Sequence, residues 1–260
     1  YTTLFRSALL SAGCILFLFW SITRLVRSLI VNEEQNLSTI DVIVILGAGF
    51  VGALAYTFSD TFWFSAVEGE VYAFSSFLTA LVFWMILRWQ DESDSVYGDR
   101  WIILIAYIIG LSIGVHLLNL LCIPAIVLVF YYQKYHAISF KGVAAAIVIS
   151  GLLIVFILFV YIPGIADMGG WFELLFVNVF GLPFHTGLIV FLALTFLVLV
   201  GAIYRFQKRM LHTSLWCLLM LTVGYTTYAV ILIRANANTP LNENAPDNIF
   251  TLKSYLNREQ

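Results

Sequence analysis

Eight long apolar segments make up most of the 260 residues, and the basic residues between them fall on one side. Segments of about 20 apolar residues are long enough to cross a bilayer. If the chain crosses eight times, alternate connections hold nine basic residues and the other internal connections hold none. The nine are Arg24, Arg27, Arg88, Arg100, Lys134, Lys141, Arg205, Lys208 and Arg209. Because Lys and Arg accumulate in short cytoplasmic loops, this asymmetry predicts that both ends of the chain lie outside the cytoplasm.

The composition indicates a membrane domain rather than a soluble one. The chain is 62% hydrophobic and 11% charged, whereas soluble domains average about 45–50% and 25%. We predict an all-α polytopic transmembrane helical bundle over residues 1–233, followed by the start of a non-cytoplasmic tail over 234–260. The predicted spans are about 4–25, 41–58, 71–89, 101–115, 117–132, 142–161, 187–204 and 213–233.

Three of these segments carry further expectations. Residues 101–132 are too many for one straight span, so we expect two short helices that meet near His116. The small residues of span 41–58 predict a helix buried among others, because small side chains let helices approach closely in lipid. Residues 163–186 mix aromatic and polar side chains, which predicts a short helix lying in the membrane interface.

Several classes of function have no support in the sequence. The net charge is −2 and the basic residues are dispersed, so we expect no nucleic-acid partner. The chain has no phosphate-binding glycine loop, dinucleotide fingerprint or paired Cys/His signature, and its four histidines are scattered. We therefore predict no metal site and no certain cofactor. Cys14, Cys122 and Cys217 are interpreted as small packing residues.

The loop over residues 59–70 is the strongest candidate site. Asp60, Glu68 and Glu70 lie in it without a basic partner, beside Trp63 and other aromatic residues. A carboxylate partly desolvated at the membrane boundary can act as a base or orient an acceptor hydroxyl. Solvated loop acids are the alternative interpretation.

Two further pairs are candidates for substrate binding. His116 and Asn119 are three residues apart in an apolar helix, and intramembrane polar groups commonly face a wet cavity or a neighbouring helix. Arg234 follows the last span and precedes Asn236, so its guanidinium could bind a lipid phosphate. A hydrogen-bonded helix contact and an ordinary interfacial anchor explain the two patterns equally well.

Three stretches together resemble a known family. They are SDTFWFSAVEGEVYA at 59–73, GLSIGVHLLN at 110–119, and RANANTP at 234–240 with LNREQ at 256–260. They are similar to the bacterial protein O-mannosyltransferase-like family of GT-C glycosyltransferases, long labelled a domain of unknown function. The resemblance extends over nearly the whole chain, and the first stretch is its most specific part.

The resemblance implies an integral enzyme of the bacterial cytoplasmic (inner) membrane with a GT-C-like helical fold. Such an enzyme takes a sugar from a polyprenyl-phosphate donor, which is its substrate rather than a cofactor. It transfers the sugar to a protein or glycan hydroxyl on the non-cytoplasmic face. The acids of the 59–70 loop and Arg234 would then be the nearest carboxylates and the phosphate-binding cation.

One feature of the family is missing from the chain. Members carry an earlier span and a first external loop with an acidic motif of the type Trp-Asp-Cys-Gly-Glu, expected to supply the catalytic acid. No match to this motif occurs here. We therefore expect a fragment without that span and loop, in which Asp60, Glu68 and Glu70 support catalysis or orient the acceptor. The alternatives are a transporter or flippase for a lipid-linked substrate, and a non-catalytic membrane scaffold.

Overall fold

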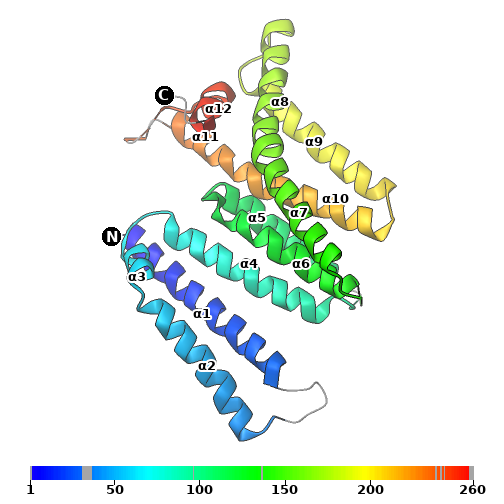
Figure 1. Cartoon of the computed structure of the whole chain (residues 1–260). Helices are drawn as coiled ribbons and strands as arrows, with labels where there is room; N and C mark the ends of the chain where they lie inside the picture. Colours follow the sequence, from blue (N-terminus) through cyan, green and yellow to red (C-terminus); the bar gives the residue numbers. More distant parts are fainter. Residues whose placement is uncertain are drawn as a thin grey trace.

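The computed structural model shows a bundle of helices and describes residues 2–30, 37–95, 97–135, 137–237, 239–240, 242 and 244–257 (Figure 1). No strand occurs among these residues, which confirms the predicted all-α polytopic bundle. In chain order the helices are α1 (Thr2–Ile30), α2 (Thr39–Thr57), α3 (Asp60–Val67), α4 (Tyr72–Glu92), α5 (Asp99–Ile113), η1 (Leu117–Cys122), α6 (Ile123–Lys134), α7 (Phe140–Phe156), η2 (Ile157–Tyr161), α8 (Ile162–Leu174), η3 (Leu175–Val179), α9 (Thr186–Arg205), α10 (Arg209–Tyr225), η4 (Thr226–Tyr228), α11 (Ala229–Asn236) and α12 (Ile249–Asn257).

Seven helical stretches in the described part of the chain are long and apolar enough to cross a membrane. They are Phe5–Ile30, Thr39–Thr57, Tyr72–Glu92, Leu117–Lys134, Phe140–Val179, Thr186–Arg205 and Arg209–Asn236. The predicted span that is not among these seven is 101–115. It corresponds to α5, whose 15 residues extend only about 22 Å. It ends at Ile113, and the following helix starts as the 3₁₀ segment η1 after His116. The break that we expected near His116 is therefore present.

The stretch from Phe140 to Val179 differs from the expectation. The helix does not end at Tyr161 before a separate interfacial helix, but continues for 40 residues. Pro163 lies in the first turn of α8, directly after the π-helical turn η2. Proline lacks an N–H group, and the wider π turn before it absorbs that loss without ending the helix. At about 60 Å, this helix is roughly twice as long as a bilayer core is thick, so it must be strongly inclined or extend beyond the membrane.

The closest helix contact joins α5 and α10. A Cβ atom on Gly224 would lie 2.5 Å from the carbonyl oxygen of Tyr107, and one on Gly110 would meet the carbonyl oxygen of Leu221. The two backbones therefore touch, as small residues allow in lipid. Around this contact a buried core joins α4, α5, η1, α6 and α10. Its fully or nearly fully buried members include Val82, Met85, Ile86, Ile105, Ile109, Ile113, Leu120 and Tyr225.

Two glycines of α2, Gly49 and Gly52, allow a close contact with one neighbouring helix, α1. A Cβ atom on Gly49 would lie 2.5 Å from Thr23 Cγ2, and one on Gly52 would lie 2.5 Å from Ile22 Cδ1, both on α1. The opposite face of α2 is open, with the Val51 side chain 67% exposed. The expectation that this helix is buried among several others is therefore wrong, because its glycines permit one close contact rather than contacts on all sides.

Ion pairs join neighbouring helices at the predicted cytoplasmic ends. Arg24 on α1 pairs with Asp91 on α4, its Nε donating to Asp91 Oδ2 at 2.8 Å. Glu92 accepts from Arg88 at 2.6 Å and from Arg100 at 2.8 Å, which links α4 to α5. Arg209 pairs with an aspartate at the start of α5 at 3.1 Å. Basic residues that define the predicted topology thus lie together at one end of the bundle.

Candidate functional site

The candidate loop folds as a short helix packed against the bundle. Helix α3 begins after Ser59, which has extended backbone angles, and ends at Val67. Phe62 holds it in place, because its side chain is only 4% exposed and its ring centroid lies 4.5 Å from that of Tyr56 on α2. The helix also packs against the outer ends of α1 and α4. "Outer" denotes here the predicted non-cytoplasmic side.

The three acids of this loop lie around α3 with exposed side chains. Asp60 is its first residue, and the N-terminal turn of a helix favours negative charge. Glu68 caps its C-terminal end, and Glu70 lies in the link to α4. Trp63 is 53% exposed and stacks on Phe58, with 6.3 Å between the ring centroids. The expected partial desolvation of the acids by these aromatic side chains is therefore not seen, and the carboxylates are open to an incoming acceptor.

The structure brings one distant candidate to this loop. The His116 ring lies 5.9 Å from that of Tyr72, the first residue of α4 and two residues after Glu70. His116 Nδ1 accepts a hydrogen bond of 3.1 Å from the backbone N–H of Leu118 and so caps η1. Asn119 is fully buried beneath it, and neither amide atom of its side chain has a hydrogen-bond partner. His116 precedes η1 and has extended backbone angles, so the expectation that His116 and Asn119 lie on one side of a helix is wrong.

Arg234 and Asn236 lie elsewhere. The Asn236 amide donates to the carbonyl oxygens of Leu232 at 2.9 Å and Asp247 at 2.7 Å, which fastens the following segment to α11. Arg234 is exposed near the end of the same helix. Figure 1 shows α11 and α12 well separated from α3. The structure does not bring Arg234 together with the loop acids, although the sequence alone suggested that they act together.

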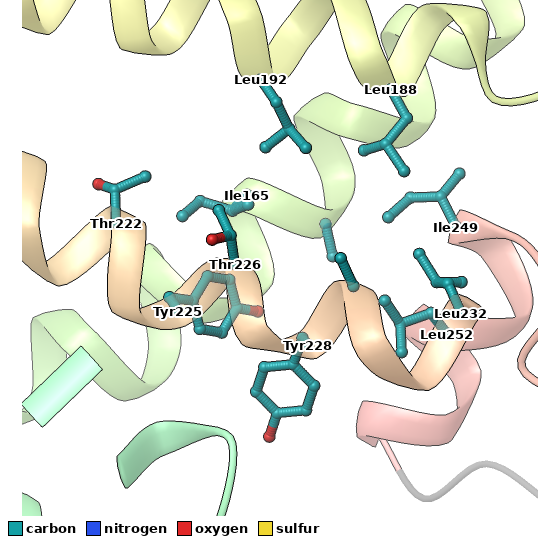
Figure 2. Close-up of a pocket in the computed structure, with 12 residues that line it drawn as sticks. Ile165, Leu188, Leu192, Thr222, Tyr225, Thr226, Tyr228, Leu232, Ile249 and Leu252 are labelled. Atoms are coloured by element: carbon teal, nitrogen blue, oxygen red, sulfur yellow. The ribbon is translucent and has the colours of Figure 1, made fainter. Parts of the chain in front are cut away.

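An apolar pocket lies beneath α12 (Figure 2). Its volume is about 60 Å³, and Leu188, Leu192, Ile249 and Leu252 point into it. Nearby tyrosine hydroxyls are already used, since Tyr228 donates to the Ile113 carbonyl at 3.0 Å. Lys253 of α12 forms an exposed ion pair with Asp167 of α8 at 2.5 Å. This pocket is too small and too apolar to bind a sugar.

A larger cavity of about 390 Å³ lies between α1, α2, α4 and η1. We call it the α1–α4 groove. It is lined by Cys14, Leu18, Ser21, Ile22, Gly52, Tyr56, Ser76, Thr79, Ala80, Phe83, Leu118 and Cys122. The sequence did not predict this groove, because its walls come from four separate elements. Small side chains on three of those segments were a local indication that helices approach each other there.

The fold and this region together define a polytopic helical membrane protein with a short helix and three exposed acids at its predicted outer surface, and a groove within the bundle. The family model of the N-terminal domain of the protein O-mannosyl-transferase TMEM260 matches residues 2–139, more than half of the 260 residues. The chain therefore belongs to this family of membrane glycosyltransferases. No curated protein and no solved structure matches the chain.

Proposed function

We propose that the protein transfers a sugar from a polyprenyl-phosphate donor to a hydroxyl of a protein or glycan, on the non-cytoplasmic face of a bacterial inner membrane. The observation that carries the proposal is the set of three exposed acids in and just after α3, a helix held against the outer ends of α1 and α4 in a chain of this family. A GT-C type fold and two non-cytoplasmic ends of the chain are part of the same proposal.

The chemistry requires a base and a positioned donor. The acceptor oxygen forms a bond to the anomeric carbon of the sugar while the bond from that carbon to the phosphate oxygen breaks. The polyprenyl phosphate leaves with the bonding electrons, and a carboxylate takes the hydroxyl proton. The exposed carboxylates of Asp60, Glu68 and Glu70, with Trp63 nearby, support a role in orienting the acceptor. In the family that the chain resembles, an acidic loop motif that does not occur in these residues is expected to supply the base.

A flippase for a lipid-linked substrate is the rival function. It would need a polar path across the membrane, and polar groups within spans are costly unless they face such a path. The α1–α4 groove is mainly apolar and lies between helices rather than along a charged channel. This supports binding of a lipid chain over passage of a sugar.

Purified full-length protein tests the proposal. It is incubated with polyprenyl-phosphate mannose and acceptor peptides or glycans, and transfer is followed by mass spectrometry. Glu70→Gln and Asp60→Asn should each reduce kcat at least about tenfold while the folded protein remains, in line with the loss of a carboxylate that orients the acceptor hydroxyl. Glu92→Gln, on the predicted cytoplasmic side, is the matched control. Full activity of both outer variants contradicts the assigned roles.

A further inference from the structure

The α1–α4 groove has the size and lining of a site for an apolar chain. Its volume of about 390 Å³ falls within the range of small-molecule sites. Two of the hydroxyl groups on its walls are satisfied within their own helices, since Ser21 donates to the Phe17 carbonyl at 2.8 Å and Thr79 to the Ser75 carbonyl at 2.9 Å. The groove therefore presents mostly apolar surface to an occupant.

The backbone around the groove also departs from a regular helix. Leu118 and Cys122 line the groove from the 3₁₀ segment η1. Irregular backbone at membrane depth is tolerated where it is buried in protein or lines a cavity. Behind this wall the Asn119 amide and the Ser75 hydroxyl are buried without hydrogen-bond partners.

A cation lies at the outer end of the same helices. Helices α1 and α4 run side by side in the same direction, because Cys14 Sγ lies 3.5 Å from the Ser76 carbonyl oxygen and Arg24 pairs with Asp91. A Cβ atom on Gly13 would lie 2.7 Å from Phe77 Cε2.

Arg6 is seven residues before Gly13 in α1, and α4 begins at Tyr72, five residues before Phe77. Seven residues are close to two helical turns, so Arg6 lies on the face of α1 that meets α4, close to the level at which α4 begins. The Arg6 side chain is exposed there.

We propose that the α1–α4 groove binds the isoprenoid chain of a polyprenyl phosphate and that Arg6 binds its phosphate. This inference rests on the proposed function and names the donor site within it. Arg6 lies about 12 Å along α1 from Cys14, where the groove begins, a distance that the first isoprene units bridge. A guanidinium suits a phosphate because it donates in a fork, and the sugar on that phosphate would lie next to Glu70. Arg234 lies on α11, which Figure 1 shows apart from α3.

Photolabelling of full-length protein tests this site. The protein is placed in phosphatidylcholine nanodiscs with a diazirine-bearing undecaprenyl phosphate, irradiated and digested. Label is expected on peptides that contain residues 14–22, 76–83 and 118–122. Arg6→Gln should reduce labelling on the order of tenfold, the loss of one charge-assisted contact, and Arg6→Lys should restore a large part of it. Ala80→Phe fills the groove and should also abolish labelling, whereas Val51→Phe on the open face of α2 should not.

Two controls separate this inference from the proposed function. Unlabelled undecaprenyl phosphate should compete with the probe, and phosphatidylglycerol should not. Equal competition by phosphatidylglycerol, label spread over all lipid-facing helices, or dependence on Arg234 rather than Arg6 would overturn the site. Mannose transfer by the wild-type protein is measured in parallel. Transfer without groove labelling refutes the groove alone, whereas groove labelling without transfer refutes the proposed function alone.

Discussion

Glu173 on α8 offers the sharpest test of how the outer part of the bundle is held together. Its side chain is 2% exposed, and its Oε2 accepts a hydrogen bond of 2.9 Å from the backbone N–H of Leu188. Its Oε1 accepts from the backbone N–H of His185. Leu188 lies in the first turn of α9, where backbone N–H groups have no partner within the helix, and His185 is the residue just before that helix. Glu173 therefore caps a neighbouring helix, with its charge at the favourable end of the helix dipole.

The cost of removing this cap follows from the contacts. Each hydrogen bond to a charged group contributes about 1.5–3 kcal/mol, and a buried donor left unsatisfied costs about 1–3 kcal/mol. Glu173→Ala leaves two donors without an acceptor in a tight site, since a Cβ atom on Gly187 would meet the backbone of Glu173. We expect a destabilisation of about 3–5 kcal/mol. Glu173→Gln keeps one acceptor oxygen and should cost about 1–3 kcal/mol.

Unfolding of the purified full-length protein, followed by tryptophan fluorescence in mild detergent, measures these differences. Asp167→Asn is the matched control, because this acid lies on the same helix and forms an exposed ion pair with Lys253. Exposed pairs contribute about 0–1 kcal/mol, so this variant should unfold close to the wild type. If Glu173→Ala is no more destabilising than Asp167→Asn, the capping argument is wrong.

Three further predictions follow from the packing and the topology. Gly110→Val should strongly reduce the yield of folded protein in detergent extracts, because the valine side chain would clash with the backbone of α10. Gly151→Val, on an open face, should not reduce it. Equal yields of the two variants would contradict the contact. Asn119→Leu should be neutral or stabilising in thermal unfolding, since it removes unpaired buried groups, and a large loss of stability would show that the amide has a partner. Glu68→Cys should react with an impermeant maleimide on whole cells and Ser95→Cys only after permeabilisation, while the reverse pattern would invert the predicted orientation.

The order and type of the helices could be predicted from the sequence because hydrophobic length and basic residues at span ends are local signals. The break near His116 was also local, since 32 apolar residues do not fit one span. The course of residues 140–179 was not predictable in this way. Proline and polar residues suggested an end to the helix, but a π turn before Pro163 let it continue. Whether such a turn forms depends on the packing around it rather than on the local sequence.

The candidate site shows the same division between local and distant information. The acids of the 59–70 loop were evident because they are adjacent in the sequence. Which cation belongs with them depends on how helices far apart in the sequence align. Arg234 was the natural choice from its place after an apolar span, yet α11 lies away from α3 (Figure 1). Arg6 was just as visible, but only the contact between Gly13 and Phe77 indicates that it lies near the start of α4.

The extent of the family match supports this choice of cation. Residues 2–139 include the three loop acids, His116, Arg6 and every residue that lines the α1–α4 groove, whereas Arg234 and Asn236 lie outside them. The groove, the Arg6 cation and the three carboxylates thus occur within one set of contacting helices. A donor site that depended on Arg234 would instead need to connect two parts of the bundle that Figure 1 shows apart. The KM for the lipid-linked donor, measured in Arg6→Gln and in Arg234→Gln, therefore discriminates between the two arrangements. A larger increase in Arg6→Gln supports the donor site at Arg6, and a larger increase in Arg234→Gln supports a site at Arg234.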